Sequence, residues 1–236
     1  MSVFTKSTRL RLAGVRMALS FGLGLIGTAN AVDIPSTCPG ADAWVQAHKA
    51  VMDKEAKRTI AATDATLHNE LVSMAEEDTR QREALIKSQG SDQAEIKRME
   101  ASDANHLAAL HRLAPHGVLP DIHLVGTDGM SALMLLVQHA NGDRAYQQEV
   151  LKNLHSRVQT GDITGESYAL LTDRVLMQKG QPQVYGTQMS VTNNVLQLYK
   201  VGAPAELNHR RDSMGLMPMR DYKCVMSMSY KMPFKD

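Results

Sequence analysis

The sequence predicts a mainly α-helical protein with long N-terminal helices, a compact helical bundle, a docked β-hairpin and a C-terminal helix. Three observations support this prediction. No proline interrupts residues 41–113, where apolar residues recur at intervals of three and four. Residues 130–178 contain three shorter helical patterns that are separated by turn-forming residues. Residues 183–199 alternate as a pair of strands would on either side of Asn193-Asn194.

The first 31 residues have the order of a removable secretory signal. An apolar run over residues 17–26 is followed by Ala29-Asn30-Ala31, a small-residue cleavage site. Four basic residues and no acidic residue precede the apolar run: Lys6, Arg9, Arg11 and Arg16. The run is too short to span a bilayer. A retained anchor or a buried core helix is the alternative, and the signal predicts a periplasmic or secreted protein.

Removal of the signal changes the charge balance. Without its four basic residues, 22 of the 26 Lys and Arg residues remain against 25 acidic residues, so the net charge becomes about −3 instead of +1. Nucleic-acid binding needs a clustered positive surface, and we expect none. No further stretch is apolar enough to cross a membrane, and no motif indicates a cofactor.

Two cysteines, Cys38 and Cys224, lie near the two ends of the mature chain. An even number of cysteines in an oxidising compartment favours a disulfide, although their spacing does not show whether the two ends meet. A bridge between them would close a loop that holds nearly the whole domain. Such a loop is worth on the order of 4 to 5 kcal/mol in the loop-entropy treatment.

Residues 32–114 form the expected N-terminal helical region. Leu67, Leu71 and Met74 illustrate its thin apolar stripe, which predicts two or three long helices. Gly90 ends one helix, and Asp92 can cap the next. These helices are also the expected surface for a protein partner.

Residues 115–236 form the expected helical core with its hairpin. An irregular connection runs from Pro115 to Gly129 and leads into a helix over residues 130–140 that is apolar on most sides. A second helix runs from Asp143 to Gly161, and a third runs from Thr164 to about Gln178. Short links between three such helices predict an antiparallel bundle.

The hairpin follows, with Asn193-Asn194 as its turn. Alternation puts one set of side chains on the face that docks on the bundle: Tyr185, Thr187, Met189 and Val191. The other face would carry Gly186, Gln188 and Ser190. Pro204 opens a last helix that ends at Gly215, and the methionine-rich tail over residues 222–232 is expected to be a further strand.

His139 is the candidate acid–base residue, because it ends the apolar helix, where the helix dipole favours imidazolium. The alternative is a histidine whose ring bonds a loop carbonyl. Candidate ligand-binding residues share hydrogen-bonding side chains in short polar clusters: Gln138, Arg174, Tyr185, Thr187, Gln188, Arg210 and Arg211. The alternative role for these glutamines and arginines is to satisfy buried backbone groups.

Two further contacts are expected of charged residues. Arg174 lies at the edge of an apolar stripe and is expected to pair with a buried carboxylate such as that of Asp78, or with an anionic ligand. Asp78 and Arg82 are one helical turn apart and can pair with each other. A metal site near His116, Asp121, His123 and His139 matches no ligand spacing, and we expect no metal.

Several short motifs follow one another between about Asp78 and Tyr222: Asp78 with Arg82, Val125-Gly126, Gln138-His139-Ala140, Asp173-Arg174, Gly180 through Gln183 to Gln188, Arg210-Arg211 and Gly215-Leu216. Their order resembles that of an uncharacterised bacterial family, a domain of unknown function. Residues 116–120 depart from the family's Gly-Trp-Pro motif, so any stacking role of that tryptophan does not carry over. The resemblance implies no activity.

Three functions are compatible with these patterns. The leading hypothesis is an exported binding module for a polar or anionic ligand, such as an envelope component, in a cleft near His139, Gln188 and Arg210. The second is a periplasmic hydrolase-like enzyme with His139 as general acid or base. The third is a helical scaffold for a protein partner, in which the polar clusters are purely structural.

Overall fold

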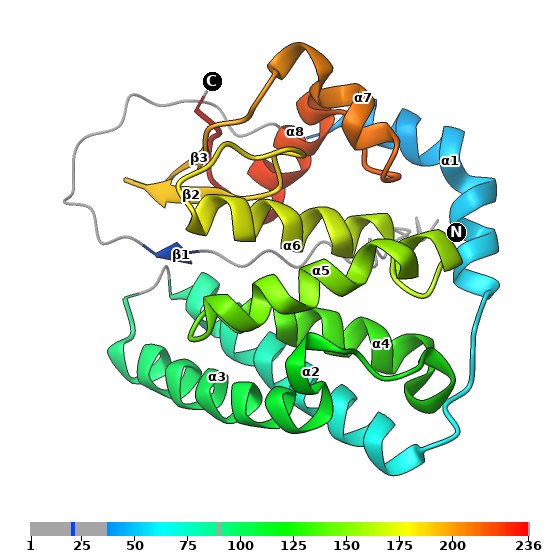
Figure 1. The fold of residues 1–236 in the computed structure, drawn as a ribbon. Coiled ribbons are helices and arrows are strands. Elements are labelled where there is room, and N and C mark those ends of the chain that lie inside the picture. Colours follow the sequence, from blue (N-terminus) through cyan, green and yellow to red (C-terminus); the bar gives the residue numbers. More distant parts are fainter. Residues whose placement is uncertain (1–19, 22–36, 89–90, 236) are drawn as a thin grey trace, which may run out of the picture.

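The computed structural model describes residues 20–21, 37–88 and 91–235, and Figure 1 shows its fold. The described residues form eight α-helices, two 3-10 turns and three short strands. This confirms the prediction of a mainly α-helical protein with a hairpin and a C-terminal helix. The predicted signal segment, residues 1–31, lies outside the described residues except for Ser20–Phe21. Among the described helices, none has both the length and the apolar character needed to cross a membrane.

Three long helices open the described chain: α1 (Pro39–Lys57), α2 (Ala65–Lys87) and α3 (Gln93–Leu113). Asp64 caps α2 by accepting a hydrogen bond from the backbone N–H of Leu67. The predicted cap Asp92 accepts from the N–H groups of Ala94 and Glu95 at the start of α3. The sequence showed the break between α2 and α3 through a glycine, whereas the break between α1 and α2 contains neither glycine nor proline.

The three predicted core helices are present as α4 (Ile122–His139), α5 (Arg144–Thr160) and α6 (Gly165–Gln178). Asp143 and Thr164 cap α5 and α6, and Gly161 ends α5 in the left-handed conformation. The irregular connection was predicted to reach Gly129, but α4 already begins at Ile122. The kink at Gly126, which has a φ of 76°, explains why the sequence pattern looked interrupted there.

One hydrophobic core joins α2 and α3 to α4, α5 and α6. Figure 1 shows α2 and α3 below α4, with α5 and α6 above. Fully buried residues from every one of these helices meet in it: Leu71, Leu110, Val125, Leu133, Leu136, Val137, Tyr146, Val150, Leu154 and Leu171. The thin stripes of α2 and α3 are therefore sufficient, because each helix contributes only one side to a shared core.

The hairpin has the predicted turn and register. Strands β2 (Met189–Thr192) and β3 (Val195–Leu198) pair antiparallel, and Thr192 lies opposite Val195. Asn193 and Asn194 have φ values of 52° and 58°. Strand β1 (Ser20–Phe21) pairs in parallel with β2. The predicted strand arm over residues 183–188 is wrong, because these residues wrap around the carboxylate of Asp173 and have no strand partner of the expected kind.

The C-terminal part forms a second core against the hairpin. It contains the 3-10 turn η2 (Pro204–Glu206), the short helix α7 (Leu207–Asp212) and α8 (Met219–Tyr230). The predicted strand over residues 222–232 is therefore wrong. Met219, Tyr222 and Met226 are spaced by three and four residues, and all three are buried on one side of a helix.

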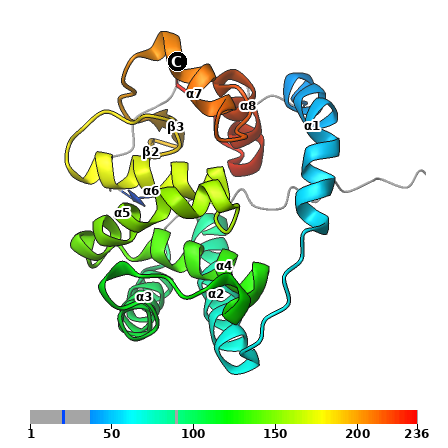
Figure 2. The ribbon, with the colours of Figure 1, turned by 45° about the vertical axis from the view of Figure 1, so that its right-hand side comes forward.

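The predicted disulfide between Cys38 and Cys224 is present, with a Cα–Cα distance of 5.8 Å. It joins the start of α1 to α8, and Figure 2 shows α1 standing beside α8 and away from the helices of the first core. Cys38 and Ala41 are buried in the second core with Met226 and Leu196. The start of α1 is thus held by one covalent bond and a small apolar contact.

Gly117 is predicted to tolerate no side chain. It lies in the 3-10 turn η1 (Pro115–Gly117), has a φ of 68°, and a Cβ atom would lie 2.5 Å from the backbone nitrogen of Val150. We expect Gly117→Ala to lower the free energy of unfolding by about 3 kcal/mol, through backbone strain and the clash with α5. Urea denaturation would measure this loss.

Gly180 provides the matched control for Gly117. Its φ of 69° is nearly the same, but nothing lies within 4 Å of a Cβ atom built there. Gly180→Ala should therefore cost only the left-handed strain, about 1 kcal/mol. Equal losses in the two variants would show that the contact between η1 and α5 is not tight.

Candidate functional site

A charged cluster crosses the first core where α2, α3 and α4 meet. It consists of Asp78 and Arg82 from α2, Asp103 from α3 and His139, the last residue of α4; we call it the Asp78–His139 cluster. Asp78 and His139 are buried, and only 1% of Asp78 is exposed. Asp78 and Arg82 stand in the stripe of α2 that otherwise carries Leu71 and Leu85. Charges in a core stripe are costly unless they are paired.

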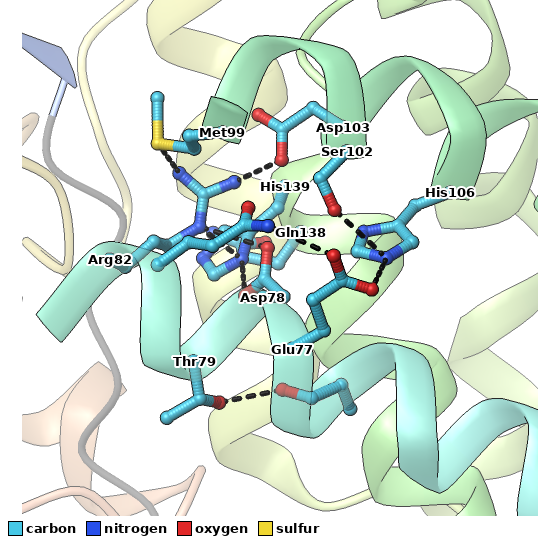
Figure 3. A network of polar contacts seen from close by, with 12 residues as sticks. Glu77, Asp78, Thr79, Arg82, Met99, Ser102, Asp103, His106, Gln138 and His139 are labelled. Atoms are coloured by element: carbon cyan, nitrogen blue, oxygen red, sulfur yellow. Dashed lines mark hydrogen bonds and ion pairs between the residues drawn. The ribbon is translucent and has the colours of Figure 1, made fainter. Parts of the chain in front are cut away.

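The four side chains of this cluster bond one another, as Figure 3 shows. Arg82 Nε lies 3.0 Å from Asp78 Oδ1, which confirms the expected pairing along α2. Arg82 Nη2 donates to Asp103 Oδ1 at 2.7 Å. His139 Nδ1 lies 2.7 Å from Asp78 Oδ2 and 2.8 Å from Arg82 Nε. One guanidinium therefore bridges two carboxylates, and one of those carboxylates also holds the imidazole.

The contacts of His139 indicate its tautomer. Nδ1 cannot both accept from Arg82 Nε, at 2.8 Å, and donate to Asp78 Oδ2, at 2.7 Å. The Nε hydrogen of Arg82 has Asp78 Oδ1 as an alternative acceptor at 3.0 Å, whereas an unprotonated Nδ1 would face the Asp78 carboxylate with its lone pair. We therefore assign a hydrogen to His139 Nδ1, which it donates to Asp78 Oδ2. His139 Nε2 is then an acceptor, and it is buried without a hydrogen-bond partner in the described part of the chain.

Burial dominates the protonation of this cluster. It lowers the pKa of His139 to about 4, and the nearby charges of Arg82 and Arg174 act in the same direction against the effect of Asp78. Burial therefore opposes the imidazolium that the helix C-terminus is expected to favour. Burial alone would raise the pKa of Asp78, but His139 and Arg82 outweigh it and the pKa is lowered. At neutral pH the cluster holds an ionised Asp78 and a neutral His139.

Asp103 and Arg82 are the more accessible members of the cluster. Their side chains are 24% and 13% exposed, compared with 1% for Asp78 and 4% for His139. Burial raises the pKa of Asp103, and the negative charge of Asp78 acts in the same direction against Arg82. A solute would therefore meet Arg82 and Asp103 before it reached the Asp78–His139 pair.

A second imidazole lies beside the cluster on α3. His106 is buried, and its Nε2 lies 3.4 Å from the hydroxyl of Ser102 and 4.0 Å from a carboxylate oxygen of Glu77. Its Nδ1 is also buried without a partner among the described residues. Figure 3 shows the ring of His106 beside Ser102 and Glu77, on the side of the cluster away from Arg82.

Most of the other predicted site residues hold one loop. Asp173 accepts from the N–H groups of Val184, Tyr185 and Thr187 and from the Thr187 hydroxyl, so Tyr185 and Thr187 belong to the wall of a carboxylate site within the protein. Gln183 closes the same loop by donating to the carbonyl of Gln188 and accepting from its N–H. We call residues 183–188 the Asp173 loop.

The predicted arginines and glutamines bond backbone carbonyls around this loop. Arg210 Nε donates to the carbonyl of Val184, and Arg211 Nη1 donates to that of Tyr185. The side-chain amides of Gln138 and Gln188 both donate to the carbonyl of Leu170 on α6. The geometry matches the alternative role stated above, in which these side chains satisfy buried backbone groups.

Arg174 bonds Asn141, and the histidines of the possible metal site differ in burial. Arg174 is fully buried and its Nη1 donates to Asn141 Oδ1 at 2.8 Å, whereas Asp78 bonds Arg82 and His139. His116 and His123 are exposed, while His139 is buried. Among the described residues, these three histidines do not belong to the group of potential metal ligands that lie within 4.8 Å of one another.

Sequence reasoning missed Asp103 and His106. A signal was present, because both residues fall on the apolar side of α3, three and four residues apart and in step with Leu110. Asp78 and Arg82 likewise fall on the apolar side of α2. Charged residues at core positions of two neighbouring helices are the pattern that would have indicated this site.

Comparison with known proteins places the chain in a family and no further. A family of unknown function (DUF6624) matches residues 65–235, so the chain belongs to this family. This confirms the resemblance to an uncharacterised domain family inferred from the sequence motifs. The match includes α2 to α8 and begins after α1. Neither the search of curated proteins nor the search of solved structures returned a match.

Proposed function

We propose that the protein is an exported, hydrolase-like enzyme in which Asp78 and His139 supply acid–base catalysis. The observation that supports this proposal is the 2.7 Å contact from His139 Nδ1 to Asp78 Oδ2, together with a buried Nε2 that has no partner in the described residues. A carboxylate that fixes the Nδ1 hydrogen of an imidazole leaves the Nε2 lone pair as a base.

A water molecule at His139 Nε2 is the simplest nucleophile. Buried polar atoms that lack a protein partner are commonly satisfied by an ordered water, and Nε2 can accept a hydrogen bond from one. Transfer of the water proton to Nε2 would create an imidazolium, which the Asp78 carboxylate stabilises and which burial and Arg82 oppose. Arg82 lies 2.8 Å from the ring and can stabilise negative charge that develops on a substrate oxygen.

The accessible side of the cluster suggests where a substrate binds. Arg82 and Asp103 are partly exposed, so a polar substrate would contact them first and reach His139 only after local opening at Arg82. A polar envelope component remains the proposed substrate class. The binding-module hypothesis has less support, because the donors of Gln188 and Arg210 are occupied by backbone carbonyls.

The proposed location is the periplasm or the exterior of the cell. The disulfide is compatible with an oxidising extracytoplasmic compartment, since such bonds rarely persist in a reducing cytosol. The basic and apolar order of residues 1–31 supports export. Compartment and catalysis are independent parts of the proposal, because the acid–base pair does not depend on the signal.

Turnover measurements with a set of chromogenic carboxylic esters, phosphoesters and envelope oligosaccharides would test the catalytic proposal. We expect wild type to hydrolyse at least one of them, and His139→Gln to lose about 100-fold or more in kcat, the usual size of a general-base contribution. His155→Gln, at an exposed histidine on α5, is the control and should retain the wild-type rate. Unchanged turnover in His139→Gln, or no turnover by wild type, would overturn the proposal.

A further inference from the structure

Three potential metal ligands converge next to the Asp78–His139 pair. Asp78, Asp103 and His106 each offer one ligand atom, and these atoms lie within 4.8 Å of one another. They come from two helices of the first core, α2 and α3. Figure 3 shows the Asp78 and Asp103 carboxylates beside the Arg82 guanidinium, and the His106 ring beside Ser102 and Glu77.

We propose that Asp78, Asp103 and His106 bind one divalent transition-metal ion of the Zn²⁺ or Mn²⁺ type. Carboxylate oxygen and imidazole nitrogen bind such ions at roughly 2.0 to 2.2 Å, so the ligand atoms of a tetrahedral ion lie about 3.5 Å apart. The three atoms lie within 4.8 Å of one another, so they would have to move closer together by up to about 1.3 Å. A purely oxygen-lined site would instead favour Mg²⁺ or Ca²⁺.

The buried state of His106 is an independent indication of a ligand. The residue is only 5% exposed, its Nδ1 has no partner in the described residues, and the contact of its Nε2 with Ser102 is long at 3.4 Å. An imidazole removed from water without strong hydrogen bonds is costly. A metal ion beside the two carboxylates would satisfy a ring nitrogen and explain why the core keeps a histidine there.

Arg82 occupies the place where the metal ion would bind. Its guanidinium supplies the positive charge between the same two carboxylates, at 3.0 Å from Asp78 Oδ1 and 2.7 Å from Asp103 Oδ1. A metal ion and this guanidinium would repel each other, so the ion must displace the arginine. The Arg82 side chain is 13% exposed, and the proposal requires it to turn toward solvent when the ion binds.

The hydrogen bond from His139 to Asp78 would also help to position a metal-binding carboxylate. A ligating carboxylate is commonly held in place by a hydrogen bond from a second residue, and His139 Nδ1 provides it. The metal site does not rest on the proposed hydrolysis, since binding of an ion requires no substrate. Failure of one proposal would therefore leave the other intact.

Isothermal titration calorimetry on the EDTA-treated, disulfide-bonded protein, with ZnCl₂ and with MnCl₂, would test the site. We expect one ion per chain in wild type. His106→Gln should weaken binding by about 10- to 100-fold or more, since even residues that only orient a ligand have effects of that size. The control is His111→Gln on the same helix, whose side chain is 48% exposed, and it should bind as wild type does.

A second variant keeps the test decisive if His106→Gln does not fold. Arg82→Gln removes the competing cation and leaves two carboxylates uncompensated, so we expect it to bind the metal at least about tenfold more tightly than wild type. The metal should also raise its thermal midpoint more than that of wild type. Three results would overturn the proposal: no binding by wild type and Arg82→Gln, weaker binding by Arg82→Gln, or wild-type affinity in a folded His106→Gln.

Discussion

Asp173→Ala should lower the free energy of unfolding by about 4 kcal/mol. Asp173 is fully buried, and its carboxylate accepts three backbone N–H bonds, from Val184 at 2.7 Å, Tyr185 at 3.0 Å and Thr187 at 2.8 Å, and a fourth bond from the Thr187 hydroxyl. Alanine would leave these four donors without an acceptor, and each buried unsatisfied group costs about 1 to 3 kcal/mol. Partial entry of water keeps the sum near the lower end of that range.

The loss should be concentrated in the Asp173 loop. Its backbone donors have no alternative acceptor in a strand, so amide exchange at residues 184–187 should accelerate more than exchange in α6, which carries Asp173. Urea denaturation of Asp173→Ala and of Asp212→Ala would measure the difference, because Asp212 is an exposed aspartate at the end of α7. A loss below about 1 kcal/mol in Asp173→Ala would show that the loop does not depend on this carboxylate.

The structure of the Asp173 loop could not be predicted from the sequence. Alternating side chains and a glycine in residues 183–188 fitted a strand arm, and the turn at Asn193-Asn194 was correct. The backbone donors of the loop are satisfied by a side chain from another helix instead of by a neighbouring strand. A contact of this kind between residues more than ten positions apart leaves no periodic mark in the sequence.

Helix positions were predictable because their signals are local. The caps Asp92, Asp143 and Thr164 are each identifiable from a few neighbouring residues, and all three bond the first turn of their helix. The intervals between Met219, Tyr222 and Met226 already indicate a helix, so the strand predicted over residues 222–232 goes against a local signal in the sequence.

Only part of the candidate site could be predicted, because only part of it follows from local spacing along one helix. The pair of Asp78 and Arg82 follows from their spacing of four on one helix. The approach of His139, which is 61 residues from Asp78, depends on how α2 packs against α4. The direction in which the pKa of His139 shifts depends on the same packing, since burial is its largest cause.

The disulfide should have the largest single effect on stability. Replacing both Cys38 and Cys224 with alanine removes a cross-link between residues 186 positions apart, and the loop-entropy treatment assigns such a loop about 5 kcal/mol. The effect acts mainly on the unfolded chain, which becomes free to expand. We therefore expect a lower urea midpoint for the double variant, by an amount that corresponds to several kcal/mol.

The place of the disulfide in the fold predicts a local effect as well. Cys38 precedes α1, and that helix is packed mainly against α8, with Val51 and Met52 exposed further along it. At its other end, residues 60 and 63 bond the α4 segment through Thr127 and His123. Without the covalent bond, α1 should separate before the first core unfolds, so limited proteolysis should cut within residues 39–57 first.

Reduction of the wild-type protein provides the matched comparison for this variant. Dithiothreitol should lower the stability of wild type to that of the double variant and should leave the variant itself unchanged, because the variant has no bond to reduce. Equal stability of oxidised wild type and the variant would contradict the entropic account. The first core is built from α2 to α6, so these helices should retain their far-UV circular dichroism in either protein after α1 is released.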